Sequence, residues 1–369
     1  MSKHILFLTN WYPTKENPSF GIFVKRHSQA LSRNYNVTVV HLLFEKGSGL
    51  IRFSYFKSDF NENTYILRIS GFLFKFFYYI PNVVSWFLFK KLDKSFKFDL
   101  IFSNVLFNSG LIGYHLSKKL KLSQVHIEHW SGIENFIRRN ILGKKGIRTL
   151  EQAETIFVVS RQLETTIKNF IPTAKILVVP NVISNFFSYR ENFKDHNFIN
   201  FIAVANWKYP KRIDLVLGGL KEFQNQNSHC KVNLKLIGKG PSLNEELIQK
   251  LNFNIERIEV VDNAELPDFY SQADFLLHFS DFETFSIVPL EALACGCPVI
   301  VSRVGVLPDF IDDSNGRIVE NNVESIAVAI AECVAQKFSR KEISENIKNV
   351  FSMERISKQF QMALQFDKS

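Results

Sequence analysis

The chain has few of the residues that mark secreted or metal-binding proteins. Its four cysteines, Cys230, Cys295, Cys297 and Cys333, are spread over 369 residues and fit neither a disulfide framework nor a CxxC metal knuckle. This scarcity is typical of a reducing compartment, in which cysteines stay as thiols. We therefore expect buried, unpaired thiols.

The chain also has little that would place it across a membrane. The N-terminal apolar run covers only residues 5–8 before Asn10 and Pro13, which is too short for a signal peptide, so it predicts a first strand. Residues 71–89 form a nearly uncharged window of 19 residues that approaches a membrane-spanning length, but Lys75 and a proline interrupt it. Two interpretations stay open, a buried or surface helix and a segment lying in the membrane interface, and a true span is the least favoured.

Positive charge and apolar residues are plentiful. Lys and Arg number 45 against 36 Asp and Glu, and the net charge of +9 favours an anionic partner such as a nucleotide, a nucleic acid or a lipid surface. No nucleic-acid-binding module or basic stripe with interleaved aromatics is recognisable, so we do not expect nucleic acid as the partner. With 46% hydrophobic residues and a length that suggests two domains, the chain can bury substantial cores.

Short apolar runs alternate with helical stretches, which is typical of α/β domains with doubly wound parallel sheets. Residues 181–198 lack a clear period, so we expect a first domain at 1–180, a linker at 181–198 and a second domain at 199–369, whose C-terminal helices could pack back on the first. Two open α/β domains in tandem place a cleft between the carboxyl ends of their two sheets, where ligands of such folds usually bind. The expected strands lie at 5–9, 37–43, 99–104, 155–160, 176–180, 201–206, 231–238, 257–262, 273–280 and 298–302, with Ser160 as the N-cap of a helix.

Two glutamates, Glu283 and Glu291, flank the apolar segment of "ETFSIVPLEALACGCPVI". We expect a strand to end near Ser280 and a helix to begin at 285–287 and to end before Gly296, which puts the first glutamate in the loop and the second inside the helix. The alternative is an exposed Glu283 and a helix-surface Glu291 without a role.

The start of this helix predicts an anion site. Unpaired backbone amides and the helix dipole favour negative charge there, and the amides concerned are those of Thr284, Phe285 and Ser286. One carboxylate can accept hydrogen bonds from hydroxyl groups beside a phosphate, and the other from hydroxyls further along. The ligand that fits this description is a sugar attached to a nucleoside diphosphate.

The segment resembles the signature of the retaining GT-B glycosyltransferases of family 4, also called glycosyl transferases group 1. In that signature a Glu and seven residues precede Glu-Ala-x-Ala-x-Gly-x-Pro-Val-Ile, and here Glu283 precedes Glu291 and "ALACGCPVI". The resemblance implies two Rossmann-like doubly wound domains facing a central cleft. It also implies that the first glutamate contacts the donor sugar and the second the ribose.

Other segments resemble the family in the same order and cover nearly the whole chain. "WYPTKENPSFGIFVKRHSQAL" is similar to the first strand-to-helix loop, in which Gly21 would let backbone approach the donor phosphate or the acceptor. "LIGKGP" resembles the Gly-x-Gly-Pro turn and contributes Gly238. Any strand-to-helix turn can carry glycines, so this second match is weak alone.

The family uses an Arg and a Lys, five positions apart, against the departing diphosphate. In "VANWKYPKR" Lys211 matches the Lys, whereas Asn206 stands where the Arg would be, and this departure puts part of the phosphate neutralisation in doubt. Arg212 or Lys208 could compensate from the same turn. The alternative is a solvated basic turn with no role in binding.

Three candidate metal ligands, His126, Glu128 and His129, lie close together in "VHIEHWSG". They lack the HExxH helical spacing, and alternate strand residues point to opposite faces, so we do not expect a zinc site. The resemblance implies instead that His129 lies close to the donor sugar; the alternative is a packed loop histidine.

The resemblance implies a glycosyltransferase. No Asp-x-Asp motif is present, so we expect catalysis without a divalent cation or another cofactor, and the scarcity of cysteine favours the cytoplasm. The partners of such an enzyme would be a nucleotide-sugar donor, a glycan or lipid-linked acceptor and an anionic membrane, which residues 71–98 would contact peripherally on the inner face of the cell membrane. Surface polysaccharide or glycoconjugate synthesis is the expected role. The rival classes are a same-fold sugar-nucleotide epimerase or hydrolase and a catalytically silent membrane-binding scaffold.

Overall fold

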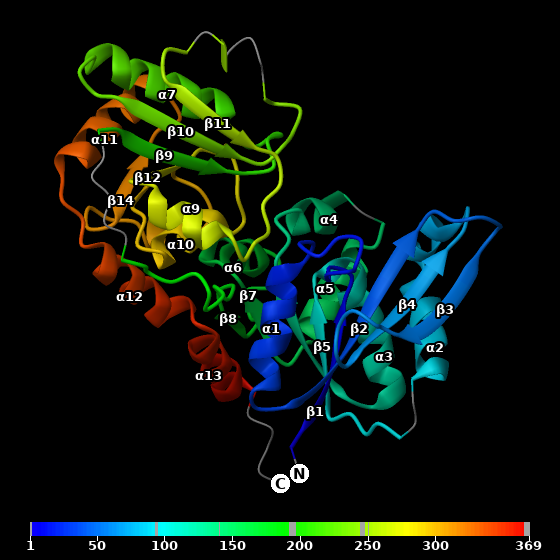
Figure 1. Ribbon diagram of the computed structural model, residues 1–369. Helices are drawn as coiled ribbons and strands as arrows, with labels where there is room; N and C mark the ends of the chain where they lie inside the picture. The colour runs from blue at the N-terminus through cyan, green and yellow to red at the C-terminus, as the bar shows by residue number, and fades with distance from the viewer. Residues whose placement is uncertain are drawn as a thin grey trace. The chain divides into compact units, whose positions relative to one another are not determined.

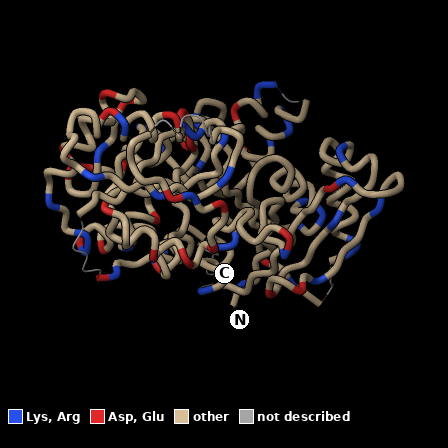
Figure 2. Tube along the Cα trace, turned by 45° about the horizontal axis from the view of Figure 1, so that its top comes forward, with Lys and Arg blue, Asp and Glu red and all other residues tan. Residues whose placement is uncertain are grey.

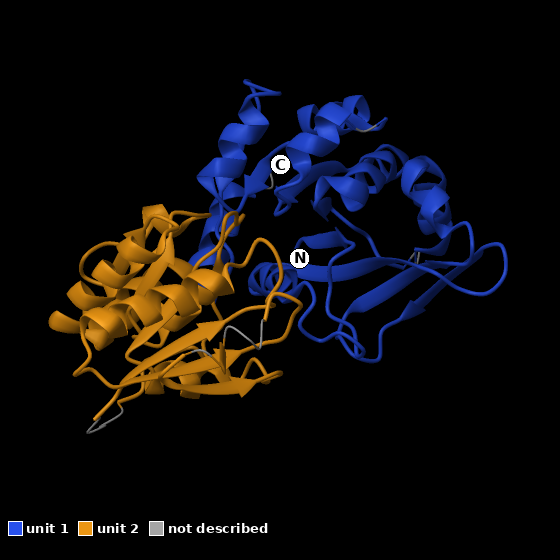
Figure 3. Cartoon of the chain, turned by 90° about the horizontal axis from the view of Figure 1, so that it is seen from above, with its two compact units in different colours: residues 1–182, 353–369 blue, residues 183–352 orange. Residues whose placement is uncertain are grey.

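Two separate sheets organise the chain, one in each of two units (Figure 3). The computed structural model describes residues 2–92, 95–139, 141–191, 197–243, 248–249 and 251–364. Residues 1–182 and 353–369 form the first unit, and residues 183–352 form the second. The chain passes between the units at residues 182–183, inside the stretch expected as a linker, and it returns to the first unit after Ser352.

The first sheet has eight strands in the order β3-β4-β2-β1-β5-β6-β7-β8, and every pairing is parallel except that of β3 with β4. The strands are β1 His4–Thr9, β2 Asn36–Glu45, β3 Arg52–Lys57, β4 Thr64–Ser70, β5 Leu100–Asn104, β6 Ser123–Glu128, β7 Ile156–Val158 and β8 Ile176–Val178. The apolar runs of β1 and β5 are buried, as expected for central parallel strands. The sequence analysis lacked β3 and β4, whose polar residues interrupt the apolar pattern, and it treated β6 as a strand only in excluding a zinc site at residues 125–132.

Helices cover both faces of this sheet (Figure 1). On one face Leu6 and Leu8 of β1 join a core with Val84 and Leu88. On the other face Phe360 packs edge-on against the rings of β5 and β7. The helices are α1 Ile22–Ser32, α2 Pro81–Lys91, α3 Leu111–Leu120, α4 Ile133–Arg139, α5 Gly143–Glu151, α6 Arg161–Lys168 and α13 Met353–Ala363. The predicted N-cap is confirmed, because Ser160 Oγ accepts from the backbone N–H of Leu163 at 3.3 Å.

The apolar window at 71–89 is not one continuous helix. A 3₁₀ turn at Phe74–Tyr79 precedes α2, and none of the described helices is long and apolar enough to cross a membrane. Helix α2 buries Val84 and Leu88 but leaves Trp86 52% exposed. The window therefore contains a surface helix with aromatic side chains on its outer side.

The second sheet has six strands in the order β11-β10-β9-β12-β13-β14, all parallel. They are β9 Ile199–Val204, β10 Val232–Ile237, β11 Asn254–Ile258, β12 Phe275–His278, β13 Val299–Ser302 and β14 Gly316–Val319. The expected strand at 257–262 is wrong in position, because β11 begins at Asn254 on the polar, partly exposed edge of the sheet, where no apolar run marks it. Strand β14 was not expected. The helices are α7 Ile213–Gln226, α9 Leu266–Gln272, α10 Ile287–Ala294, α11 Val323–Ala335 and α12 Arg340–Phe351.

Each sheet has one point at which the strand order reverses. From β1 the chain adds β2 on one side and later β5 on the other, and from β9 it adds β10 on one side and later β12 on the other. Loops that leave the carboxyl ends of such strands form the usual ligand site of open α/β sheets. The β1/β5 and β9/β12 pairs therefore mark where each unit can bind a ligand.

The cysteines behave largely as expected. Cys295, Cys297 and Cys333 are buried, whereas Cys230 is half-buried, and all four are free thiols. Burial is the main cause that raises the pKa of Cys295 and of Cys297 to about 12. Thiols of this kind are unreactive near neutral pH.

Candidate functional site

Helix α10 begins close to the carboxyl end of β12, as the sequence predicted. It runs Ile287–Ala294, and its N-cap Ser286 has a left-handed backbone with φ +68°. The backbone N–H groups of residues 284–286 donate to no other described residue, and the buried hydroxyl of Ser286 meets no partner in the described part of the chain. Unsatisfied donors at a helix start can bind an anion.

Lys211 and Glu283 come together at the β9/β12 reversal point. Lys211 follows β9, and its backbone forms a bridge to Ser280 just beyond β12. The backbone N–H of Arg212 also donates to the carbonyl of Phe279 at 3.0 Å. These contacts hold the two loops together, and the Lys211 ammonium donates to a carboxylate oxygen of Glu283. The side chains are 20% and 18% exposed, so a ligand can reach both.

His278, the last residue of β12, completes this cluster. Its Nε2 lies 3.2 Å from the Lys211 Nζ and 3.6 Å from Oε1 of Glu283. Burial, and then the charge of Lys211, lower the pKa of His278 well below 6.5, so the ring is neutral. Burial likewise lowers the pKa of Lys211 to about 8. Sequence reasoning missed His278, although a histidine in the apolar strand "ADFLLHFS" was a usable signal.

Arg212 is already engaged by two carboxylates. Its guanidinium lies 2.7 Å from a carboxylate oxygen of Asp214 and 2.9 Å from one of Asp281, and these hydrogen bonds raise its pKa. A phosphate contact would have to compete with both acids. Asn206 is exposed in the loop after β9.

Glu291 is buried inside the second unit. It is only 4% exposed, so the alternative of a helix-surface glutamate is wrong. Burial, and then the negative charge of Glu291, raise the pKa of Tyr270, whose hydroxyl has no hydrogen-bond partner in the described ranges. The two glutamates thus lie in different surroundings, Glu283 in the accessible loop before α10 and Glu291 on α10 in the protein interior.

The two predicted glycines are required by the packing of the chain itself. Gly21 is the N-cap of α1 with φ +66°, and a Cβ there would lie 2.5 Å from the backbone carbon of Trp11. Gly238 has φ +114°, and a Cβ would lie 1.8 Å from the carbonyl oxygen of Ala205. Both glycines bring loops together at a reversal point, Gly21 beside β1 and Gly238 beside β9.

His129 follows β6 in the first unit and is buried among aromatic rings. Its ring centroid lies 5.0 Å from that of Phe23 and 5.3 Å from that of His27, both on α1. Burial, followed by the nearby His27 and His126, lowers the pKa of His129 well below 6.5, so the ring is neutral. Its two nitrogens make no hydrogen bond of normal geometry to the described residues. A ring that is neutral and buried among aromatic side chains is also what the alternative of a packed loop histidine predicts.

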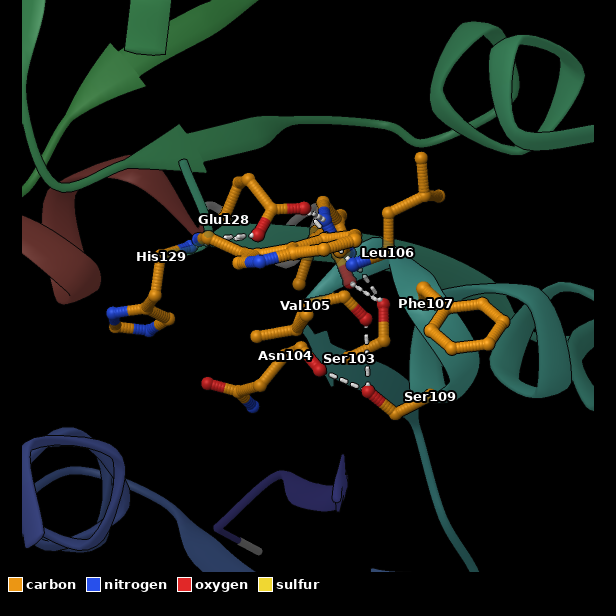
Figure 4. Close-up of polar contacts among 12 residues, drawn as sticks. Ser103, Asn104, Val105, Leu106, Phe107, Ser109, Glu128 and His129 are labelled. Carbon is orange, nitrogen blue, oxygen red and sulfur yellow. Dashed lines mark hydrogen bonds and ion pairs between the residues drawn. The ribbon is translucent and has the colours of Figure 1, made fainter. Parts of the chain in front are cut away.

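The turn that carries His129 is held by the carboxylate of Glu128 (Figure 4). One carboxylate oxygen accepts from the backbone N–H groups of His129 and Trp130 at 2.9 and 2.8 Å, and the other accepts from that of Leu106 at 2.9 Å. The second oxygen also lies 3.3 Å from Nε2 of His126, whose other ring nitrogen meets the hydroxyl of Ser103. His126 and Glu128 are thus used inside the fold, and no group of metal-ligating side chains is present within the described ranges.

Solved structures with this architecture define its class. Sucrose-phosphate synthase from Thermosynechococcus elongatus superposes with a TM-score of 0.72 at 19% identity over 98% of each chain. The Anabaena protein HepE, solved with UDP, superposes with a TM-score of 0.69 at 14% identity over 98% of this chain and 99% of its own. The fold is GT-B, with two Rossmann-like units that each contain a largely parallel sheet.

The chain belongs to the glycosyl transferases group 1 family. The model of that family matches residues 184–350, which contain the Lys211, His278 and Glu283 cluster. An uncharacterised glycosyltransferase of Methanocaldococcus jannaschii is 30% identical over 70% of this chain and 71% of its own length. The alpha-monoglucosyldiacylglycerol synthase of Streptococcus pneumoniae is 23% identical over 66% of this chain and 60% of its own length.

Proposed function

We propose that this glycosyltransferase moves a hexose-type sugar from a nucleoside-diphosphate sugar to a glycan or lipid-linked acceptor. The transfer would retain the anomeric configuration and would serve bacterial-type surface polysaccharide or glycoconjugate synthesis. The observation that carries the proposal is the pairing of Lys211 with Glu283 at the β9/β12 reversal point. At this point a cation that can bind a diphosphate lies beside a carboxylate that can accept hydrogen bonds from sugar hydroxyls.

The donor is proposed to bind along the start of α10. Lys211 and the amides of Thr284–Ser286 would contact the diphosphate, Glu283 the transferring sugar and Glu291 the ribose. Arg212 and Asn206 would lie at the edge of the phosphate site, since Arg212 is shared with two acids. Gly21 and Gly238 would shape the loops around the donor. Support for a nucleotide donor comes from the UDP bound to HepE.

In the proposed reaction the bond between the anomeric carbon and the diphosphate oxygen breaks, and the acceptor oxygen forms the new bond. The negative charge that develops on the leaving diphosphate would be stabilised by Lys211 and the helix amides, an effect worth about 3 kcal/mol per donor in comparable sites. The acceptor proton would pass to the donor phosphate. His129 would contact the donor sugar as a neutral ring, and no divalent cation is needed in this scheme because Lys211 and the amides supply positive charge.

Exposed aromatic side chains beside lysines in residues 72–90 favour a lipid-linked acceptor. This segment exposes five aromatic side chains and carries Lys75 and Lys90. We call the exposed rings the aromatic patch, and they are those of Phe72, Phe76, Tyr79, Trp86 and Phe89. Aromatic rings beside lysines suit the interface of an anionic membrane. Other Lys and Arg residues are scattered over both units instead of forming one stripe (Figure 2). We therefore propose a cytoplasmic protein that is peripheral on the inner face of the cell membrane and delivers sugar to an acceptor held there.

The test is a panel of UDP-, GDP- and ADP-sugars. One donor is expected to raise the unfolding temperature, and incubation with that donor and membrane lipid extracts should give a glycosylated product whose anomeric configuration, read by NMR, matches the donor. Release of free sugar without acceptor would support a hydrolase, and conversion of the donor to its epimer an epimerase. Failure of every donor to bind would contradict the proposal and favour the scaffold.

A further inference from the structure

His278 is buried beside the lysine that we propose for the diphosphate. It is 3% exposed, and its Nε2 faces the Lys211 ammonium at 3.2 Å. Within the described ranges, two titratable side chains contact that ammonium. They are His278 on β12 and Glu283 in the following loop. Lys211 is thus held from two sides by groups of different charge.

The hydrogen bond between the two side chains has a defined direction. An ammonium carries only donors, so the Nε2 that faces it must accept, and the proton of the neutral ring is on Nδ1. A buried polar nitrogen costs free energy unless it is hydrogen-bonded. An apolar residue at the end of β12 would fill the same space without that cost. The histidine at this position therefore indicates a role beyond packing.

We propose that His278 is a positioning residue for the transfer reaction and holds the Lys211 ammonium in place when the donor separates Lys211 from Glu283. The inference rests on the proposed function, because it takes Lys211 as the contact of the diphosphate. Of the three N–H donors of the ammonium, one reaches Glu283 and one reaches His278. Donor binding releases the first, and the imidazole keeps the flexible lysine stem ordered, so that less conformational entropy is lost on binding.

A matched pair of substitutions separates this role from packing. His278→Gln keeps an oxygen acceptor near the position of Nε2, whereas His278→Met has a similar length and no comparable acceptor. The first measurement is the pKa of Lys211 in the free protein. It is obtained from the pH dependence of the NMR signal of the lysine ε-carbon. A hydrogen bond to the charged form favours that form, so His278→Met is expected to lower this pKa by about one unit and His278→Gln to leave it nearly unchanged.

The second measurement is kinetic and uses the full chain with the donor found by the panel. His278→Met is expected to lower kcat/KM at least about tenfold, and His278→Gln less than about threefold, as expected when one hydrogen bond to a charged group is lost. Thermal unfolding checks both variants. His278→Leu replaces His278→Met if the latter does not fold.

The outcomes are distinct. Equal losses in the Gln and Met variants, with an unchanged Lys211 pKa in both, would show that His278 only fills space, and the inference would be overturned although donor binding by the unmodified protein still supports the proposed function. If the unmodified protein binds no nucleoside diphosphate, the proposed function fails, and the role of His278 in it fails as well.

Discussion

The ammonium of Lys211 donates to the carboxylate of Glu283 across two loops that leave neighbouring strands of the second sheet. The proposed function assigns these two groups to different parts of one ligand, the diphosphate and the sugar. Without donor they neutralise each other, and with donor each must find a new partner. A nucleoside diphosphate alone supplies a partner for Lys211 and leaves Glu283 with none.

Glu283→Gln is therefore expected to separate turnover from nucleotide binding. Turnover at saturating donor should fall about a hundredfold, because the carboxylate touches the group whose charge changes in the transition state. The affinity for free nucleoside diphosphate should rise, because Lys211 no longer has to leave an anionic partner. Steady-state kinetics and calorimetry measure the two effects. Weaker nucleotide binding with normal turnover would show that Glu283 has been given the wrong role.

Lys211→Ala is expected to lower kcat/KM by about a hundredfold or more, equivalent to about 2.7 kcal/mol of transition-state stabilisation. Asn206→Ala should cost far less, because Asn206 is exposed and its side-chain amide carries no charge. Lys221→Ala, which removes an exposed positive charge from α7 of the same unit, is the control for general loss of positive charge and should leave kcat/KM nearly unchanged. Equal losses for Asn206→Ala and Lys211→Ala would mean that Asn206 hydrogen-bonds the phosphate itself.

The pKa of Lys211, lowered by burial to about 8, predicts the pH dependence of nucleotide binding. The lysine is charged below this pKa and neutral above it, so the affinity for nucleoside diphosphate should be constant up to about pH 7.5 and then fall by up to about tenfold per pH unit. Calorimetric titrations between pH 6.5 and 9.5 measure this. Lys211→Ala should remove the fall, and constant affinity of the unmodified protein up to pH 9.5 would contradict a phosphate contact by a Lys211 of lowered pKa.

The positions of the site loops could be predicted from the sequence because local rules determine them. The start of α10 follows from an apolar strand, a polar turn and an apolar helix, and the N-cap role of Ser160 follows from its hydroxyl ahead of a helical period. The β3–β4 hairpin and β11 lie at sheet edges, where mixed polar residues hide the strand period.

Contacts between distant segments could not be predicted in this way. Lys211 and His278 are separated by 67 residues, and only the pairing of β9 with β12 brings them together. The sequence marks Glu291 as a helix residue but does not show whether it is buried. Its burial comes from distant elements that pack around α10, among them α9, which carries Tyr270, and α12.

The aromatic patch is expected to bind anionic membranes. Phe76→Ser with Trp86→Ser should remove most sedimentation with vesicles that contain anionic lipid at low salt, because both rings are exposed and would enter the interface. Val328→Ser, which removes an exposed apolar side chain from α11 of the second unit, is the matched control and should leave binding unchanged. If the unmodified protein stays in the supernatant, a soluble acceptor replaces the lipid-linked one.

Glu291→Gln is expected to act differently from the change at Glu283. A ribose contact is nearly the same in the ground state and the transition state. Its loss should therefore raise the donor KM and lower kcat less than Glu283→Gln does. Free nucleoside diphosphate should also bind more weakly, in contrast to the tighter binding expected for Glu283→Gln. Steady-state kinetics with donor and calorimetry with nucleoside diphosphate measure both quantities.

Because Glu291 is 4% exposed, its substitution can also disturb the interior of the second unit, and a control is needed. Tyr270→Phe removes a buried hydroxyl that lies in the field of the same carboxylate and is not proposed to contact ribose. If both variants lose nucleotide affinity and unfolding temperature together, the effect at Glu291 is structural. If Glu291→Gln alone weakens nucleotide binding at an unchanged unfolding temperature, the carboxylate contacts the ribose. Loss of turnover with unchanged nucleotide affinity would instead place Glu291 at the reacting sugar and reverse the two roles.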